Sequence, residues 1–169
     1  MEIKVEKYIY CPTCKNTLTA KNDKGEDVLV CNSCGFVFWN NPKPVVSAVI
    51  SNEGKILMLK RAKESFKGFW VLPGGFMRHD ETPEQAVVRE TKEESNLDFS
   101  IRDLIGVYTI DDDPRGKHID IIYSGVHTGD VKLSSEDVEY DFFGTQNLPD
   151  KIAYKHRNAI NDWVNKQTA

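Results

Sequence analysis

The sequence has 169 residues, enough for one full-sized domain and a small appended one. Hydrophobic residues make up 40% of the chain and charged residues 28%, with a formal net charge of −4, which argues for a globular protein and against one that coats nucleic-acid phosphates. No apolar run approaches the roughly 20 residues of a membrane-spanning helix, and the first ten residues contain no signal-peptide core, so we expect a cytoplasmic protein that uses no membrane.

All four cysteines lie in two Cys-x-x-Cys pairs, Cys11 with Cys14 and Cys31 with Cys34, separated by sixteen residues. Each pair can supply two thiolates from a tight turn, and this spacing is typical of a tetrahedral structural zinc site. The alternatives are weaker, because disulfides are uncommon in a reducing compartment, a redox dithiol needs one pair, and a catalytic zinc keeps one position open. We therefore predict a Zn²⁺-dependent zinc ribbon over residues 1–41.

The predicted ribbon carries no basic footprint, because residues 1–40 contain five lysines and five acidic residues. Binding of nucleic acid by this segment is therefore not expected. Two prolines flanked by asparagines follow at residues 40–44 and suit a stiff connector. The second predicted domain covers residues 42–169.

The second domain alternates strand and helix patterns and is expected to be an α/β domain. Strands are predicted at residues 45–50 and 56–59, joined by a turn at 52–54, and again at 105–110, 119–126 and 138–143. A helix is predicted over residues 82–95, with Thr82 as its N-cap, Pro83 in its first turn and Gln85 completing a capping box. Asn96 suits its left-handed end. A final helix is predicted over residues 151–166, and Trp70 is expected in the core.

Three glutamates of the first predicted helix, Glu90, Glu93 and Glu94, fall within one arc of roughly 100°. Crowded carboxylates repel each other unless a cation lies between them, and hard oxygen ligands suit Mg²⁺ or Mn²⁺. Arg89 can pair with one of the three. A solvated acidic helix face is the alternative for such a run taken alone. The double glycine of residues 74–75 lets bare backbone approach a ligand.

The surrounding residues resemble the Nudix box, whose pattern is Gly, five residues, Glu, seven residues, Arg-Glu, two residues, Glu-Glu, one residue, Gly. Six of its fixed positions are occupied by the expected residue: Gly75, Glu81, Arg89, Glu90, Glu93 and Glu94. The final Gly is replaced by Asn96, and Thr91 stands where the box is usually apolar. The resemblance implies an α/β/α sandwich with a mixed sheet over about residues 45–165.

The resemblance also implies a divalent-metal-dependent hydrolase of phosphoanhydride bonds. Carried over residue by residue, Gly75, Glu90, Glu93 and Glu94 would bind Mg²⁺ or Mn²⁺. The general base is Glu93 or, as in members that use a loop acid, Glu139; both remain open.

A zinc ribbon before a Nudix domain is similar to the layout of NADH pyrophosphatases, but their Ser-Gln-Pro-Trp motif is missing here. Residues 111–118 instead resemble an Asp-Pro-Arg-Gly-His segment of ADP-ribose pyrophosphatases, with one inserted lysine. We therefore expect hydrolysis of ADP-ribose to AMP and a sugar phosphate, with a broader NADH or FAD pyrophosphatase and a non-catalytic nucleotide sensor as alternatives. Arg61 and Arg115 are candidate substrate contacts. Related pyrophosphatases suggest a homodimer, and all four histidines are expected at the surface or in packing.

Overall fold

The computed structural model describes residues 8–168. The chain divides into two compact units, and the boundary falls between Asn41 and Pro42. In the described range, no helix is long and apolar enough to cross a membrane.

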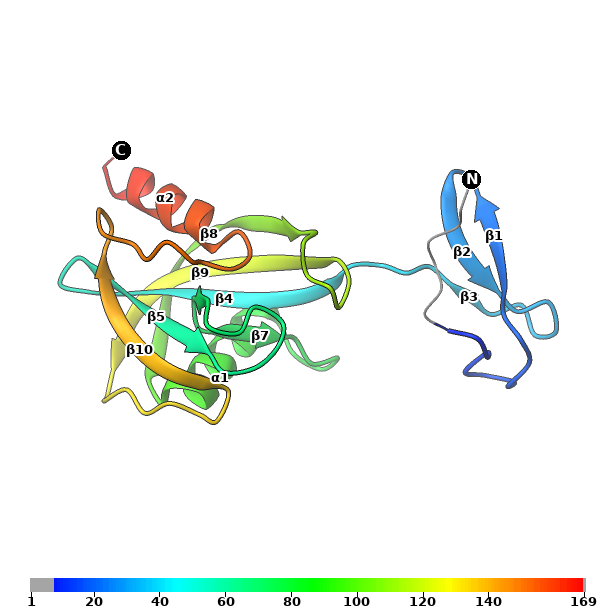
Figure 1. Ribbon diagram of the computed structural model, residues 1–169, viewed down its shortest axis with the longest axis horizontal. Helices are drawn as coiled ribbons and strands as arrows, with labels where there is room; N and C mark the ends of the chain where they lie inside the picture. The colour runs from blue at the N-terminus through cyan, green and yellow to red at the C-terminus, as the bar shows by residue number, and fades with distance from the viewer. Residues whose placement is uncertain (1–7, 169) are drawn as a thin grey trace. The chain divides into compact units, whose positions relative to one another are not determined.

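The N-terminal unit is a three-stranded antiparallel sheet in the order β1-β2-β3 (Figure 1). Its strands are β1 (Thr19–Asp23), β2 (Glu26–Val30) and β3 (Val37–Phe38). Among the described residues, its core cluster consists of the buried Cys11, Leu18, Leu29 and Cys31, with a few partly buried side chains around them. A core this small contributes little hydrophobic stabilisation, so we expect a further source of stability such as a metal.

The second unit is built on a mixed sheet with the strand order β10-β5-β4-β9-β8. Only the β4–β9 pair is parallel, and the short strands β6 and β7 pair with β5 and β4. The strands are β4 (Lys43–Asn52), β5 (Lys55–Arg61), β6 (Trp70–Val71), β7 (Gly74–Phe76), β8 (Asp98–Ile110), β9 (His118–Thr128) and β10 (Asp137–Gly144).

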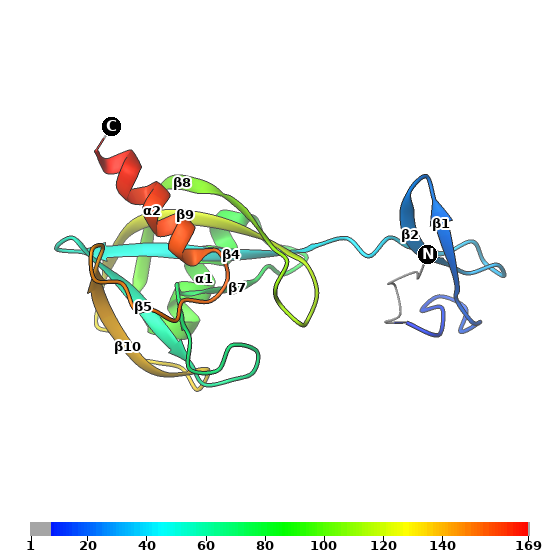
Figure 2. The ribbon, with the colours of Figure 1, turned by 45° about the horizontal axis from the view of Figure 1, so that its top comes forward.

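Two helices cover opposite faces of this sheet, as both ribbon views show (Figures 1 and 2). The helix α1 (Pro83–Ser95) packs through Ala86 and Val87 on the face that carries Val46 and Ala48. The helix α2 (His156–Gln167) packs on the other face, where Val49 of β4 lies. Because side chains of a strand alternate between faces, β4 contributes to both cores. The predicted α/β/α sandwich is confirmed.

Local signals explain several of these elements. Glu53 and Gly54, with φ values of 49° and 76°, form the two-residue turn between β4 and β5. At α1, the Thr82 side chain accepts a hydrogen bond from the Gln85 backbone, and the Gln85 side chain accepts one from the Thr82 backbone. Asn96 ends the helix with φ 63°. The predicted capping box and left-handed end are confirmed.

Two predicted boundaries are wrong. The final helix begins at His156 and not at residue 151, because the backbone of Lys151 and Ala153 bonds to both backbone groups of Trp70 and stays extended beside β6. The strand predicted from residue 105 begins at Asp98 and pairs with β9 along its whole length, through two register shifts. Trp70 is only partly buried, against Phe143 at a ring-centroid distance of 4.8 Å.

Candidate functional site

The second unit contains a cavity of about 390 Å³ that reaches both faces of the sheet near β7. Its α1 side is lined by Gly74, Gly75, Arg89, Glu90, Glu93 and Glu94, and its α2 side by Ser47, His118, Asp120 and His156. Arg61, Asp113, Arg115 and Tyr154 also belong to the lining. The lining therefore includes four of the predicted metal-binding residues and both candidate arginines. The carboxylate oxygens of Glu90, Glu93 and Glu94 do not all lie within 4.8 Å of one another. Its size is typical of a small-molecule site.

The guanidinium of Arg89 joins the acidic residues on the α1 side. It contacts both carboxylate oxygens of Glu81, Oε1 of Glu90 at 2.6 Å and Oε2 of Glu93 at 3.0 Å. Its hydrogen bonds lower the pKa of Glu81 to about 2. Glu81, Arg89 and Glu90 are largely shielded, with side chains 13 to 16% exposed, whereas Glu93 is 49% exposed. Glu93 is thus the carboxylate of this group that is most open to solvent.

Glu94 faces the glycine loop and accepts a hydrogen bond from the Gly74 backbone N–H at 2.8 Å. Burial raises the pKa of its carboxyl well above the usual range, and the nearby Asp137 and Glu90 raise it further. Burial also raises the pKa of Glu90. Both pKa shifts mean that the negatively charged forms of Glu90 and Glu94 are unfavourable here unless a further cation lies beside them.

The double glycine fits closely around these groups. A Cβ on Gly75 would lie 2.6 Å from Oε2 of Glu90, and one on Gly74 would lie 2.1 Å from the Val46 backbone oxygen. The carboxylate of Glu90 therefore lies directly against the Gly75 backbone, which only glycine allows. Oxygen donors of this kind, in an acidic and partly buried setting, fit a hard divalent cation.

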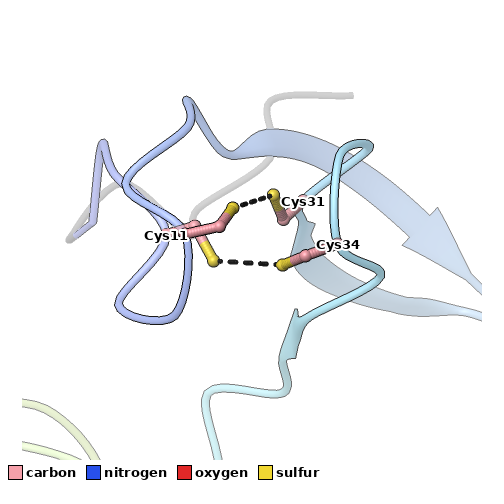
Figure 3. Close-up of side chains that lie close together, drawn as sticks. Cys11, Cys31 and Cys34 are labelled. Atoms are coloured by element: carbon pink, nitrogen blue, oxygen red, sulfur yellow. Dashed lines mark hydrogen bonds between the residues drawn. The ribbon is translucent and has the colours of Figure 1, made fainter.

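The four cysteines form the one group of three or more metal-binding side chains in residues 8–168 whose donor atoms all lie within 4.8 Å of each other. The Sγ atoms of Cys11 and Cys34 are 3.6 Å apart and those of Cys14 and Cys31 are 3.4 Å apart (Figure 3). All four are free thiols. Four sulfurs around a zinc ion at its usual bond length would be separated by about 3.8 Å, so the donor set fits zinc.

The other predicted site residues lie in different surroundings. Glu139 lies on β10, is 53% exposed and pairs with Lys60 at 2.8 Å; it does not line the cavity. Arg61 donates from Nε to the Ser65 carbonyl at 3.0 Å. Arg115 forms a 2.7 Å ion pair with the buried Asp113.

A buried polar group on the α2 side was missed by the sequence analysis. His118 and His156 are each 2% exposed, and they line the cavity with Ser47 and Asp120. A signal was available, because Ser47 and Asp120 interrupt two strands that otherwise consist mainly of apolar residues. No spacing rule connects them to His156, which is distant in the chain.

The NUDIX domain family model matches residues 41–163. The chain belongs to the Nudix family. It is 42% identical over 131 residues to an ADP-ribose pyrophosphatase of Methanocaldococcus jannaschii, which covers 76% of this chain and 77% of that protein. A Nudix hydrolase structure from Nitrosomonas europaea aligns with a TM-score of 0.83 at 28% identity, over 95% of this chain and 93% of the other. An NAD-capped RNA hydrolase of Vibrio atlanticus is 29% identical over 93 residues, which are 54% of this chain and 33% of that protein.

The protein is therefore a Nudix hydrolase, and five of its six matched box residues line one side of the cavity: Gly75, Arg89, Glu90, Glu93 and Glu94. Nudix hydrolases use divalent metals, and the acidic residues of α1 beside the double glycine fit that requirement.

Proposed function

We propose that this Nudix hydrolase cleaves the pyrophosphate bond of ADP-ribose and releases AMP and ribose 5-phosphate. The observation that carries the proposal is the 42% identity to an ADP-ribose pyrophosphatase over about three quarters of both chains. The Arg115 segment, which resembles that of ADP-ribose pyrophosphatases, adds support because Arg115 lines the same cavity as the box glutamates.

In this proposal, Glu90, Glu93, Glu94 and the Gly75 carbonyl hold Mg²⁺ or Mn²⁺. A metal bound there supplies charge that polarises the phosphoryl oxygens and stabilises the leaving phosphate. Glu93, the most exposed of the three carboxylates, accepts a proton from the attacking water. The new P–O bond forms as the bridging P–O bond breaks, and the bridging oxygen leaves on the second phosphate.

Two arginines of the cavity are assigned to the substrate. Arg115 and Arg61 carry permanent positive charge and would contact phosphate oxygens. Glu139 is the weaker of the two base candidates, because its side chain is engaged by Lys60 outside the cavity.

The N-terminal unit, residues 1–41, is proposed to be a separate zinc ribbon with a structural role. Its four thiols surround a space of the right size for Zn²⁺. Four cysteines without a disulfide suit a reducing compartment, which supports a cytoplasmic location. A homodimer and a nucleotide substrate are further parts of the proposal, and we assign no role in binding nucleic acid.

A broader dinucleotide pyrophosphatase that accepts NADH or FAD is the second candidate. The similarity to the NAD-capped RNA hydrolase favours it, although it covers only 33% of that protein. Both candidates release AMP, so the partner fragment distinguishes them.

A substrate panel resolved by chromatography tests the proposal. ADP-ribose, NADH, FAD, diadenosine polyphosphates and nucleoside triphosphates are each incubated with enzyme and Mg²⁺ or Mn²⁺. We expect AMP and ribose 5-phosphate from ADP-ribose, with the highest kcat/KM of the panel. Faster cleavage of NADH would select the second candidate, and hydrolysis of neither compound would overturn both.

A further inference from the structure

A buried hydrogen-bonded group lies on the α2 side of the cavity, away from the box glutamates. Ser47 on β4, Asp120 on β9 and His156 at the start of α2 come from three separate elements. The Ser47 hydroxyl donates to Oδ2 of Asp120 at 3.0 Å, and Nε2 of His156 lies 3.2 Å from the same oxygen. Two side chains therefore converge on one carboxylate oxygen.

The backbone fixes which nitrogen of His156 carries its proton. The Leu72 N–H donates to Nδ1 of His156 at 2.9 Å, so Nδ1 is an acceptor and bears no hydrogen. Nε2 must then be the protonated nitrogen, and it donates to Asp120. Oδ2 of Asp120 thus receives hydrogen bonds from two donors, the Ser47 hydroxyl and Nε2 of His156.

The second oxygen of the same carboxylate has no such donor. Among the residues that the structure describes, nothing donates a hydrogen bond to Oδ1 of Asp120, although the residue is only 1% exposed. Asp120 lines the cavity. A buried carboxylate oxygen without a donor is unfavourable, so a donor from a bound molecule, a water or a ligand, would stabilise this oxygen.

The side chains around Asp120 suit a flat aromatic ring. Phe76 and His118 lie with ring centroids 5.1 Å apart. Tyr154 and Ile110 complete this part of the lining. Aromatic side chains of this kind stack on nucleobases.

We propose that Asp120 is a specificity-determining residue that accepts a hydrogen bond from the exocyclic amino group of adenine. The inference rests on the proposed function, because it places the adenosine half of the substrate on the α2 side of the cavity. Adenine presents an N–H donor at this position, whereas hypoxanthine presents a carbonyl oxygen, which the bare carboxylate oxygen would repel.

Binding of AMP, IMP and N6,N6-dimethyl-AMP to the full-length wild-type protein, measured by calorimetry with Mg²⁺, tests the inference without any variant. We expect AMP to bind at least about tenfold more tightly than either analogue, since both lack the amino hydrogen. Equal affinity for AMP and IMP overturns the inference, as does the absence of binding by all three nucleotides.

The Asp120→Asn variant provides a sharper test, because its neighbours determine which way the new side-chain amide is oriented. Nε2 of His156 can only donate, so the asparagine carbonyl must take the place of Oδ2 and its NH₂ group must take the place of Oδ1. The preference should then reverse in favour of IMP. A ratio of two affinities within one variant does not depend on the folded fraction.

The matched control is Asp103→Asn, which makes the same change at an exposed position of β8. It should keep the wild-type preference for AMP. If Asp120→Asn weakens AMP and IMP equally, Asp120 is only structural and the inference fails.

Hydrolysis of ADP-ribose, measured separately, keeps the two proposals apart. Wild-type turnover of ADP-ribose without discrimination between AMP and IMP removes the base-reading role and leaves the proposed function intact. Tighter binding of AMP than of IMP, without turnover of ADP-ribose, removes the proposed function and leaves the base-reading role of Asp120 intact.

Discussion

Arg89 holds three carboxylates that would otherwise repel one another. Its guanidinium contacts Glu81, Glu90 and Glu93, and it also donates to the Phe76 carbonyl at 3.1 Å. Glu94 is outside this group and bonds to the glycine loop. The four acidic side chains are therefore held by two guanidinium groups, those of Arg89 and Arg78, and by the backbone N–H groups of Arg78 and Gly74. Two cations leave the charge of four carboxylates incompletely balanced.

Glu94→Gln tests whether the cavity binds a divalent cation. The amide oxygen can still accept from the Gly74 N–H, so the fold should be kept, but one metal ligand is lost. Saturating Mn²⁺ should raise the melting temperature of the wild type by about 3 °C and that of the variant by much less. Glu139→Gln, with its side chain on Lys60, is the control and should show the wild-type shift. Equal shifts in all three proteins would contradict metal binding by Glu94.

Asp137 lies at the start of β10 and is 9% exposed, and burial raises the pKa of its carboxyl to about 6. The folded state therefore binds this proton more tightly than the unfolded chain, whose pKa is about 3.9. Its contribution to stability is complete below about pH 4 and is lost as the pH rises towards 6.

Asp137→Asn should remove the loss of stability that accompanies ionisation of Asp137, because asparagine does not titrate. Allowing for solvent screening, we expect the variant to be more stable than wild type by about 1 kcal/mol at pH 7 and nearly equal to it at pH 4. Urea denaturation at both pH values, without added divalent metal, measures this. A difference that is the same at both values would rule out titration of Asp137 as its cause.

Gly74 and Gly75 are adjacent at the start of the short strand β7, and each makes a different close contact. Gly74→Ala forces a Cβ to within 2.1 Å of the Val46 backbone oxygen, which cannot move without disturbing β4. Gly75→Ala meets only the end of the Glu90 side chain, which can rotate away. The absence of a side chain at Gly74 is thus needed for the fold, and its absence at Gly75 is needed for the position of the Glu90 carboxylate.

We therefore expect opposite effects from the two alanine variants. Gly74→Ala should lower the free energy of unfolding by about 3 kcal/mol, whereas Gly75→Ala should lower it by less than about 1 kcal/mol. Gly75→Ala should instead reduce kcat about 10- to 100-fold, because Glu90 is displaced. Urea denaturation and ADP-ribose turnover of both variants measure the two effects. Full activity in Gly75→Ala would contradict the close contact with Glu90.

Elements with local signals were predictable from the sequence, and those that depend on distant contacts were not. The capping box and Asn96 define α1 within fifteen residues of chain, and four of the six matched Nudix box positions lie on the same stretch: Arg89, Glu90, Glu93 and Glu94. The start of α2 depends instead on Trp70, whose backbone holds Lys151 and Ala153 extended. Likewise, Asp120 and His156 are brought together only by the packing of α2 on the sheet, so no local pattern indicates them.

The two units of the chain have separate hydrophobic cores. The N-terminal core is built around Cys11 and Cys31, and neither cysteine belongs to the two cores of the Nudix unit. Each unit can therefore respond to a different metal, with zinc expected in the first and a hard divalent cation in the second.

Cys31→Ser should separate these contributions. We expect loss of bound zinc and of the ordered ribbon, with kcat/KM for ADP-ribose kept within about twofold, because independent units tolerate each other's loss. Zinc content and turnover are measured on the same preparation, with the exposed Thr13→Ser as the control. A fall in turnover in proportion to the zinc lost would show that the ribbon supports the active site.

The glutamate-lined cavity of the Nudix unit is the centre of the whole account. The most direct measurement compares Mg²⁺-dependent release of AMP from ADP-ribose by the wild type and by Glu93→Gln, with circular dichroism as the check of the fold. We predict Mg²⁺-dependent turnover by the wild type and a loss of about 10²- to 10⁴-fold in kcat in a folded variant. Turnover by Glu93→Gln equal to that of the wild type, or turnover that is independent of divalent metal, would contradict metal-dependent hydrolysis in this cavity.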